Sequence, residues 1–182
     1  LNVGPRSAGS SPGPICYGRG GTEVTVTDAN LTLQRLAMDH PLGGKIEPSV
    51  AATSAALDAL AQHGGISDRY QMAAGIIRRA VTKMVASIRE ISISRGYDPR
   101  ECVLVAFGGA GPMHATAIAE ELGIEKILIP QIPGNFSAWG LLSSDIRHDL
   151  AETVLLDLQQ DNMEQVQMVI SRLRQQAHER LS

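Results

Sequence analysis

The stretch CVLVAFGGAGPMHATAIAEELGIEKILI, residues 102–129, decides the fold. It contains two unbroken apolar runs of strand length, 102–107 and 126–129, separated by a glycine turn and a helical pattern from Pro112 to Leu122. Apolar runs without alternation are typical of strands covered on both faces, as parallel strands usually are. The stretch therefore predicts a βαβ unit of two adjacent parallel strands, and the class is α/β.

The rest of the chain is dominated by helical patterns. Ser67-Asp68 is expected to cap the longest, which runs to about Arg95 with Gly96 as its stop. The β-branched residues 22–27 predict a short strand, after which Thr27 or Asp28 caps a helix to about Ala37. Further helices are expected over 48–63, 137–143 and from about 161, and a strand over 153–158.

Composition excludes several classes of function. The chain has 182 residues, 43% of them hydrophobic, which is enough for one domain or two small ones. Its net charge of −3 gives no indication of a nucleic-acid partner. Aromatic residues make up 3%, too few for stacking on single-stranded nucleic acid. No apolar run is long enough to span a membrane, and residues 1–14 lack a signal-peptide pattern, so a cytoplasmic location is expected. Cys16 and Cys102 are expected to be free thiols.

The ends of the chain indicate a segment of a longer protein. It begins inside a glycine- and proline-rich loop and stops directly after an amphipathic helical pattern. Any activity is therefore expected to belong to a larger parent.

The glycine turn is the candidate nucleotide-binding element. Its residues are Gly108, Gly109, Ala110, Gly111 and Pro112. Glycines let the backbone approach a ligand, and a helix N-terminus offers partial positive charge to a phosphate. A tight strand-to-helix turn without a ligand explains the same residues. A Rossmann-type dinucleotide-binding domain is a rival, although the third glycine position holds a histidine and no acidic residue follows the second strand.

His114 and Asp28 are the catalytic candidates. His114 lies in the first turn after the glycines, where an imidazole could donate to a phosphate or transfer a proton, or could be a partly exposed helix residue. Asp28, with Asn30, could hold the water shell of Mg²⁺ or a substrate, whereas capping a helix is the ordinary use of Asp at this place. Cys16, His40, His114 and His148 lack the spacing of a zinc cluster, so no metal site is predicted.

Two groups of exposed polar residues complete the candidates. Arg6, Ser7, Tyr17 and Arg19 lie in the glycine-rich opening loop, where they could face a substrate or only connect elements. The charged residues of the longest helix are expected to form its solvated face; they are Arg78, Arg79, Lys83, Arg89 and Glu90.

Three blocks of sequence carry a resemblance to a known family. They are VGPRSAGSSPGPICYGRGGTEVTVTDANLTLQRL (3–36), RGYDPRECVLVAFGGAGPMHATAIAEELGIEKILIP (95–130) and PGNFSAWGLLSSDIRHDL (133–150). In this order they resemble the hydantoinase A family, which includes 5-oxoprolinase and the acetone and acetophenone carboxylase subunits. The resemblance covers residues 1–150 as the C-terminal part of a nucleotide-binding domain, and 151–182 look like the start of a C-terminal region.

The resemblance implies a fold, an activity and partners. The fold is part of an actin, hexokinase and acetate kinase type of ATPase, with this segment on one side of the nucleotide cleft. The activity is ATP- and Mg²⁺-dependent opening of a cyclic amide (hydantoin, N-methylhydantoin or 5-oxoproline) or activation of a ketone for carboxylation, with a B-type subunit or domain. A non-catalytic scaffold or subunit-docking module is the alternative.

We expect these 182 residues by themselves to hydrolyse no ATP. Phosphoryl transfer depends on positioning and on charge stabilisation of the γ-phosphate, and the acidic Gly-Gly-Thr hairpin that the family carries upstream is not among them. Phosphate release from ATP and Mg²⁺ by the purified chain is the measurement. Release that disappears when one residue of this chain is mutated would contradict the expectation.

Overall fold

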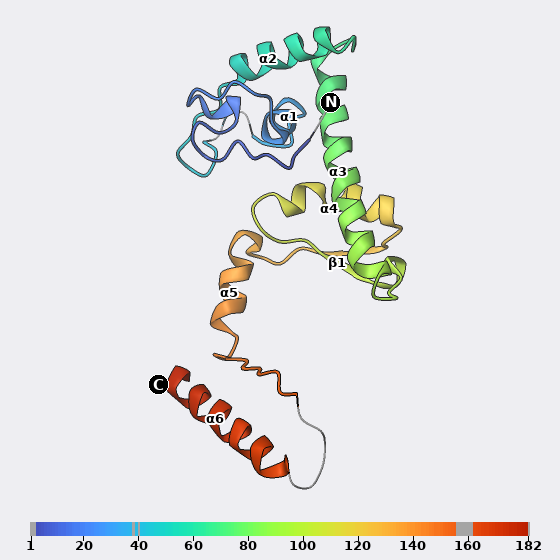
Figure 1. Ribbon diagram of the computed structural model, residues 1–182. Coiled ribbons are helices and arrows are strands. Elements are labelled where there is room, and N and C mark those ends of the chain that lie inside the picture. Colours follow the sequence, from blue (N-terminus) through green and yellow to red (C-terminus); the bar gives the residue numbers. More distant parts are fainter. Residues whose placement is uncertain (1–2, 38, 40, 156–161, 182) are drawn as a thin grey trace. The chain divides into compact units, whose positions relative to one another are not determined.

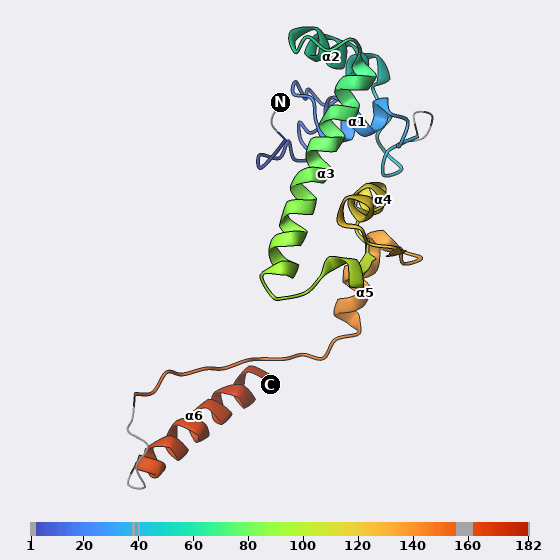
Figure 2. The ribbon, with the colours of Figure 1, turned by 90° about the vertical axis from the view of Figure 1, so that its right-hand side faces the viewer.

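The computed structural model describes residues 3–37, 39, 41–155 and 162–181, which form two compact units, Leu1–Phe136 and Ser137–Ser182. Figures 1 and 2 show the order of the elements along the chain. The helices and strands are η1 (Ile15–Tyr17), α1 (Val26–Thr32), α2 (Val50–His63), α3 (Arg69–Ile93), η2 (Pro99–Glu101), β1 (Val103–Val105), α4 (Gly111–Leu122), β2 (Lys126–Leu128), η3 (Pro133–Asn135), α5 (Phe136–Leu142) and α6 (Met163–Leu181).

Helix α3 is the element against which the first unit is assembled. Its N-terminus is capped by Asp68, whose Oδ1 accepts hydrogen bonds of 2.8 Å from the backbone N–H groups of Tyr70 and Gln71, as predicted. Helices α1, α2 and α4 all contact α3, and both views show it running past the other elements of the unit (Figures 1 and 2). Its buried apolar face is formed by Met72, Ala73, Ile76, Ile77, Ala80, Val81 and Val85.

The charged face of α3 is exposed but not entirely free of contacts. Arg78 and Arg79 are exposed, as expected. Lys83 donates through Nζ to the carbonyl of Val3, and Arg89 donates through Nη2 to the carbonyl of Glu121 at 3.0 Å. The predicted solvated face therefore also ties the opening loop and the end of α4 to this helix.

The predicted βαβ unit is confirmed. Strands β1 and β2 are adjacent and parallel, with Val103 opposite Lys126 and Val105 opposite Leu128, and α4 connects them. Gly111 rather than Pro112 is the first residue of α4, so the proline takes the second helical position.

The expected burial of these strands on both faces is wrong. Leu104 packs against the core, but Val103 and Leu128 are each 51% exposed. Within the described residues, the sheet has two strands, and their outward side chains have no covering layer. The two strands therefore carry more apolar side chains than the described residues bury.

The strand expected over 22–27 is also wrong, because residues 22–24 are irregular, Thr25 is a helix N-cap, and Val26 and Thr27 begin helix α1. Thr25 is the N-cap, and it forms a capping box with Asp28 at the third helical position. Neither Thr27 nor Asp28 is the cap residue, and the helix ends at Thr32 instead of about Ala37. A β-branched run needs a strand partner, whereas the Thr-x-x-Asp pattern satisfies its backbone groups locally.

The Asp28 carboxylate joins α1 to the opening loop. It is fully buried, and its Oδ1 accepts from the backbone N–H of Cys16 at 2.7 Å. Its Oδ2 accepts from the Ile15 N–H at 3.3 Å and from both the N–H and the hydroxyl of Thr25 at 2.8 Å. One side chain thus satisfies four donors from two segments of the chain.

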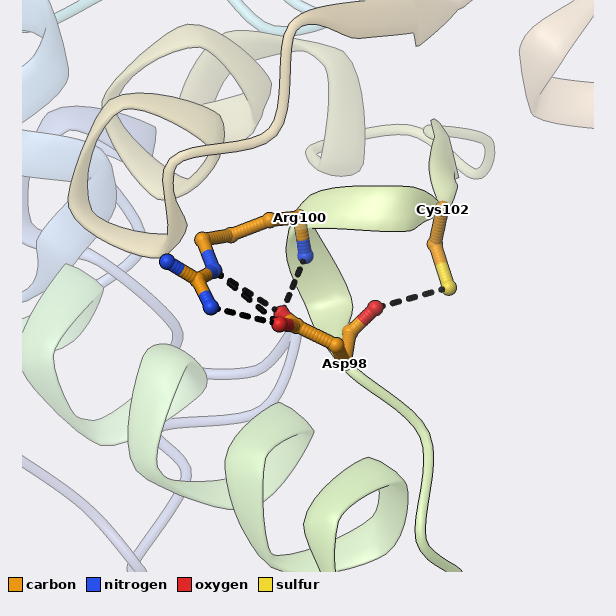
Figure 3. A network of polar contacts seen from close by, with 3 residues as sticks. All are labelled: Asp98, Arg100 and Cys102. Carbon is orange, nitrogen blue, oxygen red and sulfur yellow. Dashed lines mark hydrogen bonds and ion pairs between the residues drawn. The ribbon is translucent and has the colours of Figure 1, made fainter.

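A second polar cluster holds the connection between α3 and β1. Arg100 donates through Nε and Nη2 to the Asp98 carboxylate, with a shortest distance of 2.7 Å, and Cys102 Sγ lies 3.5 Å from the Asp98 carbonyl (Figure 3). The hydrogen bonds from Arg100 lower the pKa of Asp98 to about 2. The cluster is exposed, so it fixes the local turn more than it stabilises the whole protein.

The second unit holds most of α5 and all of α6, both predicted from the sequence. Neither helix has a buried residue, and Trp139, Leu141 and Leu142 are among its exposed apolar side chains. Residues 153–155 are irregular, and the remainder of the strand predicted over 153–158 lies outside the described residues. No helix in the described ranges is long and apolar enough to cross a membrane.

We predict that Asp28→Ala lowers the free energy of unfolding by about 3 kcal/mol, because it leaves buried backbone N–H groups of the opening loop without an acceptor. Asp58→Ala is the matched control. It removes an exposed ion pair with Arg69 and should cost about 0–1 kcal/mol. Urea denaturation of the folded variants measures both. An Asp28 variant no less stable than the Asp58 variant would contradict a stabilising role for the Asp28 hydrogen bonds.

Candidate nucleotide-binding turn and neighbouring residues

The glycine turn between β1 and α4 is in contact with residues 133–136, the segment that contains η3 and the start of α5. The backbone N–H of Gly108 donates to the carbonyl of Pro133 at 2.7 Å. The rings of Phe107 and Phe136 lie with centroids 5.4 Å apart and planes tilted by 57°. Gly108 has φ +85°, a backbone conformation that favours glycine. This glycine is therefore required by the turn itself.

Gly109 and Gly111 have no such structural requirement. Neither has a positive φ, and a Cβ added at either would meet no atom within 4 Å. Gly109 and Ala110 are exposed, and no side chain caps the N-terminus of α4. The two glycines therefore leave open space beside backbone N–H groups at the positive end of a helix, the arrangement in which an anion or nucleotide can approach.

His114 is buried, which differs from the partly exposed residue that the simpler interpretation predicted. It is 5% exposed, and its Nδ1 has no hydrogen-bond partner. Burial, and secondarily the positive charge of Arg35, lower the pKa of His114, so the neutral imidazole is favoured. A phosphate or proton-transfer role for His114 stays a prediction, and the side chain as placed has little access to solvent.

Asp28 acts as a structural residue in this fold. Its two oxygens are occupied by the four donors described above, and it is fully buried. Asn30 is also buried, with Nδ2 donating to the Val26 carbonyl at 3.0 Å and Oδ1 without a partner. Within the described residues no hydrogen bond joins Asp28 to His114. The two catalytic candidates therefore do not form a hydrogen-bonded pair.

The thiols and histidines do not form an obvious ligand cluster. Both cysteines are free, Cys16 buried and Cys102 exposed. Burial and the adjacent Asp28 carboxylate raise the pKa of the Cys16 thiol to about 12, so it stays protonated. His148 is exposed, and His40 lies outside the described residues. No three His, Cys, Asp or Glu side chains of the described part are grouped to hold a metal, and the prediction of no metal site remains one.

The structure gathers three of the four polar residues from the opening loop around one cleft. Arg6, Ser7 and Tyr17 line a cavity of about 570 Å³, together with residues of α1, α2 and α3. Arg19 instead donates to the carbonyl of Ser10. Sequence reasoning missed Thr27, which lines the same cleft, because the predicted strand hid its position in the first turn of α1.

A parallel βαβ unit with a glycine turn at the start of its helix defines an α/β protein, and sequence comparison then gives the family. A profile of the Hydantoinase/oxoprolinase family matches residues 1–150. The chain belongs to this family.

Individual relatives agree with the assignment. The chain is 45% identical over 178 residues to the caprolactamase subunit alpha of Pseudomonas jessenii, covering 96% of this chain and 25% of that protein. It is 34% identical over 193 residues to the 5-oxoprolinase of Dictyostelium discoideum, covering 98% of this chain and 15% of that protein. The chain thus spans a quarter or less of the length of these relatives.

Solved structures share the fold. The crystal structure of the ATP-dependent caprolactamase from Pseudomonas jessenii matches with a TM-score of 0.75 over 97% of this chain and 26% of that one, at 45% identity. A second match is the nucleotide-free structure of acetone carboxylase, an enzyme of ATP-dependent acetone carboxylation. Its TM-score is 0.77 at 27% identity, over 99% of this chain and 26% of that one. The arrangement of helices and strands described above is therefore common to both.

We predict that His114→Leu makes the stability less dependent on pH. Because the folded-state pKa of His114 is lowered from 6.5, its contribution to the free energy of unfolding is fully present above that value. The contribution is lost as the pH falls through the lowered pKa. Unfolding measured at pH 7.5 and 5.5 should show a larger loss in the wild type than in the variant. Equal losses would show that the imidazole titrates as freely in the folded chain as in the unfolded one.

Proposed function

We propose that this chain is part of an ATP-dependent enzyme that hydrolyses a small cyclic amide, and that its glycine turn contacts the nucleotide. The main support for nucleotide contact is the open space at Gly109 and Gly111. Neither the backbone φ nor the packing requires glycine at these two positions. The relatives support the class of reaction, because they include an ATP-dependent caprolactamase and a 5-oxoprolinase. On this proposal the fold is one side of a nucleotide cleft of the actin, hexokinase and acetate kinase type.

The residues present fit such a ligand. The backbone N–H groups at the start of α4 lack a side-chain cap, and the helix dipole adds partial positive charge there. Side chains at the two glycines would fill the space beside these groups. Mg²⁺ would enter with the phosphates of ATP, since it is commonly held by phosphate oxygens, water and only one or two carboxylates. ATP supplies the phosphoryl group, and this chain contributes positioning.

Two other functions stay open to test. A ketone carboxylase would share the nucleotide site, because acetone carboxylase has the same fold over this region. A non-catalytic scaffold or subunit-docking module would keep the fold without binding nucleotide. The subunit name of the caprolactamase relative supports a B-type partner subunit or domain in the enzyme proposal. Nucleotide binding by the full-length protein separates the enzyme classes from the scaffold.

We predict that Gly109→Val in the full-length protein weakens ATP binding at least about tenfold, or ~1.4 kcal/mol, because its side chain fills the space through which the backbone approaches the ligand. Calorimetric titration with ATP and Mg²⁺ is the measurement. Gly109→Ala should give a smaller loss.

Ala51→Val is the control, since it adds the same branched side chain at an exposed position of α2. It should leave ATP affinity unchanged. If a folded Gly109→Val protein bound ATP with undiminished affinity, the glycines would serve only to form the turn.

A further inference from the structure

The cleft of about 570 Å³ in the first unit lies apart from the glycine turn in its lining residues. It is formed by the opening loop, the start of α1 and one residue each from α2 and α3. Its volume is within the range of small-molecule sites. None of the residues 108–112 lines it, so it needs an explanation of its own.

One part of the cleft wall is apolar. Val24 and Val26 come from the entry to α1, Leu60 from α2 and Ile76 from α3. Ile76 is 4% exposed and belongs to the core of the unit. A ligand that packs against this wall gains by removing apolar surface from water.

Residues that carry hydroxyl groups line the same cleft. Tyr17 and Thr27 have no side-chain hydrogen bond within the described structure, and neither takes part in the capping box beside them. Ser7 Oγ accepts from the Gly9 N–H at 3.1 Å, which leaves its own proton available. Hydroxyls of this kind can donate to a carbonyl and accept from an N–H.

The charges at the cleft compensate one another. Arg6 and Glu23 are the charged residues of its lining, and Arg6 Nη2 lies 2.5 Å from Glu23 Oε2. Both side chains are mostly exposed, so the pair stands towards solvent. A polyanion such as ATP that approached Arg6 would be repelled by the adjacent Glu23 carboxylate. An uncharged ligand is not repelled in this way.

We infer that this cleft binds the substrate of the proposed reaction, a small uncharged cyclic amide. Its methylene ring packs against the partly buried Val26 and Leu60, and its carbonyl and N–H bond with the hydroxyls of Tyr17 and Thr27. The inference rests on the proposed function for the identity of the amide as a substrate. The cleft itself is independent of the glycine turn.

The test uses two conservative variants of the full-length protein, Thr27→Val and Tyr17→Phe, each of which removes a hydroxyl and little else. With ε-caprolactam or 2-pyrrolidinone as substrate, each should raise KM for the amide about fivefold, as expected for one lost hydrogen bond. KM for ATP should not change. Thr82→Val is the control, because Thr82 is exposed and its Oγ1 bonds within its own helix, to the Arg78 carbonyl at 2.9 Å.

Binding measured without ATP separates failure of the cleft from failure of the proposed function. Saturation-transfer NMR should detect both lactams on the wild type and weaker binding on the two variants. If the full-length protein hydrolyses no amide but Thr27→Val still weakens lactam binding, the cleft assignment holds and the proposed function fails. Absent lactam binding, unchanged binding in both variants, a raised KM for ATP alone, or tighter binding of anionic 5-oxoproline than of 2-pyrrolidinone would overturn the inference.

Discussion

The first unit depends on one constraint, the burial of the apolar face of α3. Each of its large apolar side chains contributes about 1.5–3 kcal/mol when buried, and α1, α2 and α4 all contact this helix. The same face sets the functional geometry. Ile76 is both a core residue and part of the cleft wall, and Val85 belongs to the same core cluster as Ile118 of α4, the helix that begins at the glycine turn.

Buried polar groups then fix the loops that packing alone leaves free. The Asp28 carboxylate holds residues 15–16 and the N-cap Thr25 around one point, so the opening loop closes over the start of α1. Pro14 and Tyr17, on either side of the bound residues, line the cleft. A carboxylate that looks catalytic in sequence therefore serves the site by positioning backbone, while hydroxyls nearby remain available to a ligand.

The two proposed sites differ in the chemistry that they offer. The start of α4 presents backbone N–H groups and a helix dipole, which suit an anion, and the cleft presents apolar wall, hydroxyls and a compensated ion pair, which suit a neutral molecule. An enzyme that couples ATP to the opening of an amide requires both kinds of site. Membership of the Hydantoinase/oxoprolinase family gives this combination its chemical context.

The sequence by itself determined the elements whose signals are local or strongly periodic. Asp68 and the 25-residue pattern of α3, the apolar runs on either side of the glycine turn, and the family blocks over 1–150 required no tertiary information. Tertiary structure decided the rest. Within the described structure residues 22–27 form no strand: Thr25 caps α1 in a capping box with Asp28, and Val26 and Thr27 begin the helix. The burial of His114, the bonds from Ile15 and Cys16 to Asp28, and the cleft beside Thr27 depend on residues far apart in the sequence. Local periodicity does not report such neighbours.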